Sequence, residues 1–204
     1  MSKVLLLFAH PVFQTSVLNK ALLDGVAAME NVTVHDLYEC YPNFMIDVRY
    51  EQQLLDAHDV VIFQHPFYWY SCPSILKEWI DLVWEHGYAY GTNGHALRGK
   101  RFMSSITAGG DSKNYAGELN IRGLLKPFEY SAKLCEMDFL PPFITYGGNK
   151  IKAGYHDPNL PESYLNKQVK TFKQLLDDLI NDRINVRGSE NYPTMNHKLE
   201  ADND

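Results

Sequence analysis

The sequence VLLLFAHP, residues 4–11, places six apolar residues in a row and ends them at a His-Pro pair. A short, continuous apolar run of this kind predicts a strand buried on both faces, as strands of a parallel sheet are. The pattern returns at Val60 to Phe63, which is soon followed by a second His-Pro pair, His65-Pro66. Three further strands are expected, over residues 32–34, 102–106 and 139–146.

Apolar residues at helical spacing lie between these strands. The spacing predicts helices near residues 18–29, 48–57, 76–83, 124–134 and 162–182. Regular alternation of strand and helix predicts an α/β protein, and five strands are too few for a TIM barrel. We therefore expect a flavodoxin-like fold: an open, doubly wound, parallel sheet of five strands in the order 2-1-3-4-5.

The rest of the chain is expected to form connections and a tail. Residues 38–47 and the glycine-containing stretch 86–99 show no periodicity, so both are predicted to be irregular. Residues 1–182 are predicted to form a single domain. Residues 183–204 are polar and aperiodic, and we expect them to be a disordered tail or an arm that wraps a partner.

The composition excludes several classes of protein. The chain has 204 residues, of which 45% are hydrophobic, so it can bury a core without disulfides. Its net charge of −6 argues against nucleic acid as a partner, because the phosphate backbone repels an acidic surface. The cysteines Cys40, Cys72 and Cys135 form no CxxC pair, which predicts a reducing, cytoplasmic location. No apolar run is long enough to cross a membrane.

Three loops of unusual composition follow the first, third and fourth predicted strands. They are residues 10–19, 65–73 and 107–115. The carboxyl ends of parallel strands meet at one edge of the sheet, which is where ligands of such folds bind. A helix begins near Thr15 and Ser16, and its backbone N–H groups and hydroxyls could hold a phosphate; a simple N-cap is the alternative.

The other two loops suit a flat ring. Four successive aromatic residues, 67–70, could form a wall for an aromatic ring system, or could pack in the core or against a second subunit. Gly109-Gly110 either lets a ligand approach the backbone closely or marks a tight turn. A phosphate cradle, an aromatic wall and a glycine ledge at one sheet edge together predict a site for flavin mononucleotide (FMN).

No motif supports a different chemistry. The sequence lacks GxGxxG, the dinucleotide fingerprint, and GxxxxGK, the phosphate loop of nucleoside triphosphatases. It also lacks the HExxH of zinc proteases and the GxSxG elbow of hydrolases. No paired histidine ligands are evident, so no metal site is predicted.

Several motifs together resemble those of a known family. They are Ala9-His10-Pro11, Asp36-Leu37-Tyr38, YPNFMID (41–47), QHPFYWYSCP (64–73), LKEWID (76–81), GYAYG (87–91) and LPPF (140–143). On these residues the chain is similar to the flavin-dependent NAD(P)H:quinone reductases. Within them it is most similar to the ancillary proteins of glutathione-gated potassium efflux systems. The matches extend from about Lys3 to Tyr146.

The resemblance implies a bound flavin, a homodimer and an active site that the partner subunit completes. It places the first loop at the flavin phosphate, the aromatic run beside the isoalloxazine ring, and the fourth strand's loop at the polar edge of the ring. The implied cofactor-binding residues are His10, Ser16, Val17, Leu18, Asn19, Pro66, Phe67, Tyr68, Trp69, Tyr70, Thr107, Ala108, Gly109 and Gly110.

The resemblance also implies one catalytic residue, Tyr115. It falls where the family's eukaryotic quinone reductases have a tyrosine near the reduced flavin. Those enzymes carry a histidine six residues further on, and Ile121 stands at that position here. A tyrosine–histidine proton relay is therefore not expected in this chain.

Two functions remain open. In the first, NAD(P)H passes a hydride to bound flavin and leaves, and a quinone or similar flat acceptor then takes the electrons, with ping-pong kinetics. FMN is favoured over FAD because the chain shows no adenine-binding element; NADH and NADPH are not distinguished. In the second, the chain is a regulatory subunit of a potassium efflux antiporter at the cytoplasmic face of the membrane, with secondary catalysis or none. An electron-carrying flavodoxin is disfavoured, because the aromatic loop indicates a covered slot.

Overall fold

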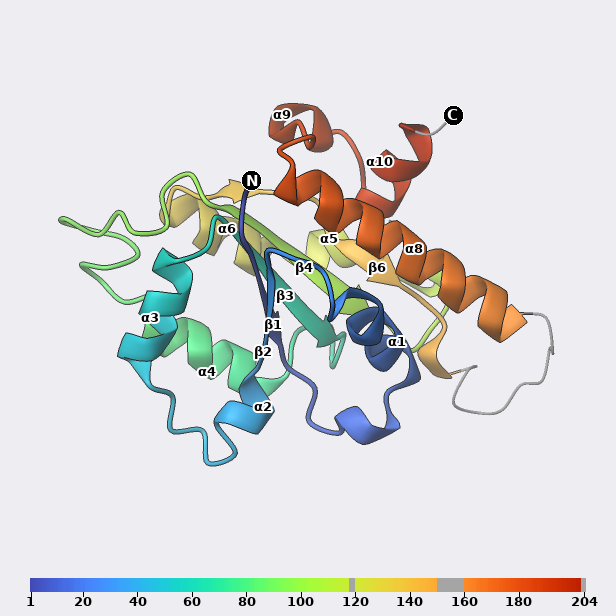
Figure 1. Ribbon diagram of the computed structural model, residues 1–204, viewed down its shortest axis with the longest axis horizontal. Helices are drawn as coiled ribbons and strands as arrows, with labels where there is room; N and C mark the ends of the chain where they lie inside the picture. The colour runs from blue at the N-terminus through green and yellow to red at the C-terminus, as the bar shows by residue number, and fades with distance from the viewer. Residues whose placement is uncertain (118–119, 150–159, 203–204) are drawn as a thin grey trace.

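A twisted parallel sheet runs through the centre of the molecule (Figure 1). The computed structural model describes residues 1–117, 120–149 and 160–202. Neighbouring strands pair in the order β2-β1-β3-β4-β5, and β6 also pairs with β4. The flavodoxin-like fold and the predicted strand order are therefore confirmed. The strands are β1 (Val4–Phe8), β2 (Val32–Asp36), β3 (Val60–Pro66), β4 (Arg101–Thr107), β5 (Asp138–Phe139) and β6 (Phe143–Thr145).

Helices cover both faces of this sheet (Figure 1). The apolar core on one face includes side chains of α1, α8 and α10, and the core on the other face includes side chains of α2 to α6. The helices are α1 (Val17–Val26), α2 (Leu37–Cys40), α3 (Val48–Asp56), α4 (Ser74–Val83), α5 (Ile121–Leu124), α6 (Lys126–Leu134), α8 (Leu160–Ile180), α9 (Val186–Ser189) and α10 (Met195–Ala201).

Strand β1 shows why the opening apolar run predicted the fold. Its five residues are all buried, and none is more than 1% exposed. Successive side chains of a strand point to opposite faces. Leu5 and Leu7 therefore enter the core beneath α3 and α4, whereas Val4, Leu6 and Phe8 enter the core beneath α1 and α8. Only a strand covered on both faces requires apolar residues at every position.

The fifth predicted strand, residues 139–146, is interrupted in the structure. Its two segments, β5 and β6, both pair with β4 and so share one position in the sheet. Pro141 and Pro142 lie between them, and proline has no N–H to donate to a neighbouring strand. The chain stays against β4 up to the break, because the N–H of Leu140 donates to the carbonyl of Phe102 at 2.9 Å.

Two other expectations need correction at the level of elements. The stretch 38–47, predicted to be irregular, includes most of the short helix α2, whose first N–H groups donate to the side chain of Asp36. The helix predicted over 124–134 is two helices, α5 and α6, that meet at Leu125. Pro127 sits in the first turn of α6, where its missing N–H costs no hydrogen bond.

Residues 183–202 of the predicted tail are neither disordered nor extended away from the domain. It forms α9 and α10, and α10 packs on α8 and β6. Met195 is fully buried and Leu199, one helical turn later, is 3% exposed. Two apolar side chains four residues apart are enough to anchor a short helix, although they are too few to stand out in a polar sequence. Residues 203–204 lie outside the described part.

Candidate functional site

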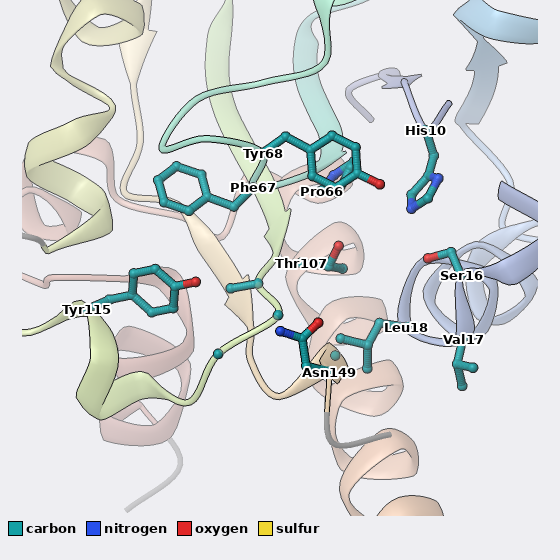
Figure 2. Close-up of a pocket in the computed structure, with 14 residues that line it drawn as sticks. His10, Ser16, Val17, Leu18, Pro66, Phe67, Tyr68, Thr107, Tyr115 and Asn149 are labelled. Carbon is teal, nitrogen blue, oxygen red and sulfur yellow. The ribbon is translucent and has the colours of Figure 1, made fainter. Parts of the chain in front are cut away.

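The loops after β1, β3, β4 and β6 surround a pocket at the carboxyl edge of the sheet. It has a volume of about 270 Å³. Figure 2 shows His10 and Ser16 on one side of it and Phe67 and Tyr115 on the opposite side. The lining residues are His10, Ser16, Val17, Leu18, Pro66, Phe67, Tyr68, Thr107, Ala108, Gly109, Gly110, Tyr115, Gly148 and Asn149.

One side of the pocket is the start of α1. Ser16 occupies the N-cap position, but its hydroxyl caps no backbone N–H of the helix. Instead Ser16 Oγ accepts a hydrogen bond of 3.0 Å from Nδ2 of Asn19. The first-turn N–H groups have no acceptor within a helix, and within residues 1–117, 120–149 and 160–202 no other group accepts from them. They are therefore available beside the pocket-lining residues Val17 and Leu18. The helix dipole adds partial positive charge here, so this side suits an anion.

His10 stands beside this helix start and is 5% exposed. The backbone N–H of Val12 donates to Nδ1 of His10 at 3.1 Å. In a neutral imidazole the proton then lies on Nε2, so this edge of the ring is a donor. The Tyr68 ring stands edge-on to the imidazole at a centroid separation of 6.1 Å. The two rings link the anion side of the pocket to its aromatic side.

Asn19 has a different place from the one expected of a cofactor ligand. Its side chain does not line the pocket and is 1% exposed. Nδ2 donates to Ser16 Oγ and, at 2.8 Å, to Thr107 Oγ1, while Oδ1 accepts from Nε2 of Gln64 at 2.7 Å. These bonds tie α1, β3 and β4 together directly behind the pocket. Asn19 therefore holds the lining residues in position.

The aromatic side of the pocket is formed by Phe67, Tyr68 and Tyr115. Phe67 and Tyr115 stand edge to face, with their ring centroids 5.9 Å apart. Both come from loops at the ends of neighbouring strands, since the N–H of Phe67 donates to the carbonyl of Thr107 at 2.8 Å. Burial raises the pKa of the Tyr68 phenol, which therefore stays protonated at neutral pH. This side offers ring faces and edges to a flat ligand.

The other two aromatics of the predicted wall do not line the pocket. Trp69 is 93% exposed and Tyr70 is 52% exposed. They are the two central residues of a tight turn in which the N–H of Ser71 donates to the carbonyl of Tyr68 at 2.9 Å. Their φ angles are +49° and +63°, which is the backbone of a type I′ turn. The Tyr70 ring stands edge-on to the pocket-lining ring of Phe67, at a centroid separation of 6.2 Å.

The floor of the pocket is the glycine ledge after β4. A Cβ atom at Gly109 would lie 2.7 Å from Nδ2 of Asn149, so the Asn149 side chain would have to move to admit it. A Cβ atom at Gly110 would lie 3.3 Å from the ring of Tyr115. Among the described residues, the N–H groups of Gly109 and Gly110 donate to no protein acceptor. The ledge therefore combines close access to the backbone with two available donors.

Two residues that line the pocket, Gly148 and Asn149, were not predicted from the sequence. Their N–H groups donate to the carbonyls of Ala108 and Gly109 at 3.0 and 2.9 Å, so they lie against the ledge. Figure 2 shows the Asn149 amide directed into the pocket. The sequence does contain a pattern that could have predicted them, because a Gly-Gly pair follows β6 as one follows β4, and the two strands are neighbours. The pattern was missed because the end of β6 was not recognised as a separate strand end.

Tyr115 lines the pocket beside Gly110. Figure 2 shows its hydroxyl directed toward the centre of the pocket. It ends a short 3-10 turn, residues 112–115, that Asp111 caps. Ile121, six residues after Tyr115, is 2% exposed in the apolar core and carries no group that can move a proton.

The sequence profile of the flavodoxin-like fold family matches residues 2–165 of this chain. The chain belongs to the flavodoxin-like family. Among curated relatives, the glutathione-regulated potassium-efflux system ancillary protein KefG of Yersinia enterocolitica is 51% identical over 154 residues. The match covers 74% of this chain and 84% of that protein.

Solved structures of the flavodoxin-like family are also similar. General stress protein 14 of Treponema denticola, in complex with FMN, is 33% identical, with a TM-score of 0.77, covering 87% of this chain and 99% of that one. A protein of P. pentosaceus described as an NADPH-quinone reductase is 28% identical, with a TM-score of 0.68, covering 82% and 96%.

Two further observations bear on this flavodoxin-like protein. Among the described residues, no group of three or more histidine, cysteine, aspartate or glutamate side chains could hold a metal ion. In the same part of the chain, no helix has the length and apolar character needed to span a membrane.

Proposed function

We propose that this protein is a flavin-dependent oxidoreductase that oxidises NAD(P)H and reduces a quinone-like acceptor. One observation carries the proposal: an uncapped helix start, three aromatic side chains and a glycine ledge with available donors face a single pocket. The likeness to an FMN complex and to a quinone reductase supports it.

The residues present fit FMN. The N–H groups at the start of α1, with Ser16 and His10, would hold the phosphate. Phe67 and Tyr68 would contact the ring system, and the N–H groups of Gly109 and Gly110 would meet its polar edge. When bound, the flavin would supply the capacity to accept and to release a hydride.

The protein's own part in such a reaction is positioning and charge stabilisation. Phe67, Tyr68 and Tyr115 leave a slot for one flat molecule at a time, which supports successive use of the slot by the nicotinamide and the acceptor. The Tyr115 hydroxyl would donate a hydrogen bond where negative charge develops during reduction. Ile121 supplies no second proton carrier, so Tyr115 would exchange its proton with solvent or substrate.

A homodimer is part of the proposal. Trp69 and Tyr70 are exposed in the single chain, although they adjoin the pocket. Large exposed aromatics at such a place are typical of a surface that another protein covers. A second copy of the chain would bury them and close the open side of the slot.

The second candidate function is that of an ancillary subunit of a potassium efflux antiporter. The name of the 51% identical relative supports it. In this role the protein would be cytoplasmic and would bind the antiporter at the inner face of the membrane. The two functions are compatible, because the pocket and an antiporter-binding surface need not overlap.

An absorbance titration tests the enzymatic function. The purified protein, saturated with FMN and freed of excess, should show flavin bands that bleach with NADPH under anaerobic conditions and return with menadione. Gly109→Ala should weaken FMN binding, because its Cβ would displace the Asn149 side chain that lines the pocket. Gly188→Ala is the matched control, since its Cβ would lie at ordinary contact distance from Asn185. Failure to retain flavin, or bands that never bleach, would leave the ancillary function.

A further inference from the structure

A second group of reactive side chains lies at the edge strand of the sheet, outside the pocket. His35 is near the carboxyl end of β2, Cys40 ends α2, and Glu51 is on α3. Nε2 of His35 lies 2.7 Å from Oε1 of Glu51, and Nδ1 of His35 lies 3.8 Å from Sγ of Cys40. A thiol, an imidazole and a carboxylate thus stand in line, contributed by three elements.

The surroundings of Glu51 determine where the histidine proton lies. The Tyr41 hydroxyl donates to Oε1 of Glu51, and Nε1 of Trp79, which can only donate, bonds to Oε2 at 2.7 Å. Glu51 therefore acts as an acceptor throughout, and Nε2 of His35 carries the proton that it shares with Oε1. The lone pair of Nδ1 is then directed at the thiol, which is the tautomer a general base needs.

The three residues differ in their exposure to solvent. Glu51 is 0% exposed and His35 is 6% exposed, whereas Cys40 is on the surface. Burial raises the pKa of the Cys40 thiol, and the carboxylates of Glu51, Asp36 and Glu39 raise it further. The thiol therefore rests in its protonated form, and its reaction depends on a partner that removes the proton. Among the described residues, Nδ1 of His35 is the nitrogen in contact with it.

We propose that Cys40 is a modification site for neutral electrophilic alkenes of the α,β-unsaturated carbonyl class, with His35 as general base and Glu51 as the residue that positions it. The proton of the thiol passes to Nδ1 of His35 as sulfur bonds to the β-carbon. The π electrons of the alkene move toward the carbonyl oxygen, and the α-carbon then takes a proton from His35 or water. The product is a thioether, and no oxidant or reductant is required.

The charge around Cys40 selects among electrophiles. Asp36 and Glu39, on either side of the start of α2, carry negative charge beside the thiol. An electrophile with its own carboxylate would be repelled at short range, whereas a neutral one would not. The site is therefore suited to uncharged reagents, and it is independent of the function proposed for the pocket.

The chain contains its own controls for a test. Cys72 is partly buried, and Cys135 is 3% exposed in the apolar core. Alkylation of the full-length protein by N-ethylmaleimide at pH 7, followed cysteine by cysteine by mass spectrometry, reports all three rates together. Cys40 should react faster than it does in the urea-unfolded chain, although its surroundings disfavour the thiolate. Protection of Cys135 confirms that the protein stays folded.

The variant His35→Gln tests whether His35 acts as the general base. Glutamine can still donate from Nε2 to Glu51, but it offers no basic nitrogen to the thiol. The rate at Cys40 should fall about 100-fold, the usual contribution of a positioned base, while Cys72 and Cys135 keep their rates. In the wild type, a maleimide bearing a carboxylate should react several-fold more slowly than N-ethylmaleimide at Cys40, after each rate is divided by its value in the unfolded chain.

Two results would overturn the proposal. One is a Cys40 rate in the folded wild type no higher than in the unfolded chain, which needs no variant to establish. The other is an unchanged Cys40 rate in His35→Gln with Cys135 still protected. Equal normalised rates for the two maleimides would remove the preference for neutral reagents.

Discussion

At the scale of single residues, the carboxyl ends of the central strands bury an unusual amount of polar side chain. His65 on β3 is 0% exposed, and among the described residues its Nε2 has no hydrogen-bond partner. Its Nδ1 lies 3.0 Å from the carbonyl of Pro66, so the neutral ring donates there. Burial lowers the pKa of His65 from 6.5 to about 4, because a charged imidazole would lose its hydration.

This pKa predicts how stability depends on pH. Between about pH 6.5 and 4 the unfolded chain binds a proton that the folded His65 does not. The free energy of unfolding should therefore fall as pH drops through this window, by up to about 3 kcal/mol from this group. Urea unfolding at several pH values should show a weaker dependence in His65→Asn than in the wild type. Parallel curves for the two proteins would contradict the assignment.

Tyr115 carries the second prediction at this scale. Tyr115→Phe removes the one hydroxyl that we expect to stabilise charge in the slot, and should lower kcat of the flavin-loaded enzyme by roughly 10- to 100-fold. Tyr146→Phe is the matched control, because its ring lies 5.9 Å from that of Tyr115 but does not line the pocket. Equal effects of the two changes, measured by stopped-flow reduction and reoxidation, would indicate a packing role instead.

At the scale of elements, the buried strands were predictable because a strand covered on both faces leaves an unbroken apolar run. The break between β5 and β6 was not predictable. Pro141 and Pro142 lack the N–H groups that strand pairing needs, but the sequence does not indicate at which residue pairing with β4 resumes. Most pocket residues followed from the strand ends, because topology alone brings those ends together. Asn19 could not be assigned, because its role depends on partners 45 and 88 residues away.

The turn at Trp69 and Tyr70 predicts a stabilised variant. Side chains other than glycine and asparagine are strained at positive φ, by roughly 1–2 kcal/mol per residue. Trp69→Asn combined with Tyr70→Gly should therefore raise the free energy of unfolding of the single chain by about 1–3 kcal/mol. Thermal and urea unfolding would measure it. A loss of stability would show that the two aromatics make contacts that outweigh the strain.

At the scale of the whole molecule, the same turn predicts the oligomeric state. Light scattering with size exclusion should give twice the chain mass of 23.4 kDa. Trp69→Glu should shift the protein to monomer, because it places charge where a partner buries an aromatic ring. Tyr130→Glu on α6, also at an exposed site, should leave the dimer intact. A dimer that survives Trp69→Glu but dissociates in Tyr130→Glu would indicate that the interface lies on α6 instead.

The placement of α10 has a consequence for how the protein behaves in a crowded solution. The Asn196 side chain accepts from the N–H of Ile144 at 2.8 Å and donates to its carbonyl at 3.2 Å, on the outer edge of β6. An amide side chain thus occupies the groups that another chain's strand would otherwise join. Beside it, Pro141 and Pro142 offer no donors at all. The C-terminal residues therefore cover this edge of β6. We expect a protease that removed them to expose an N–H and a carbonyl group to which a strand of another chain could pair.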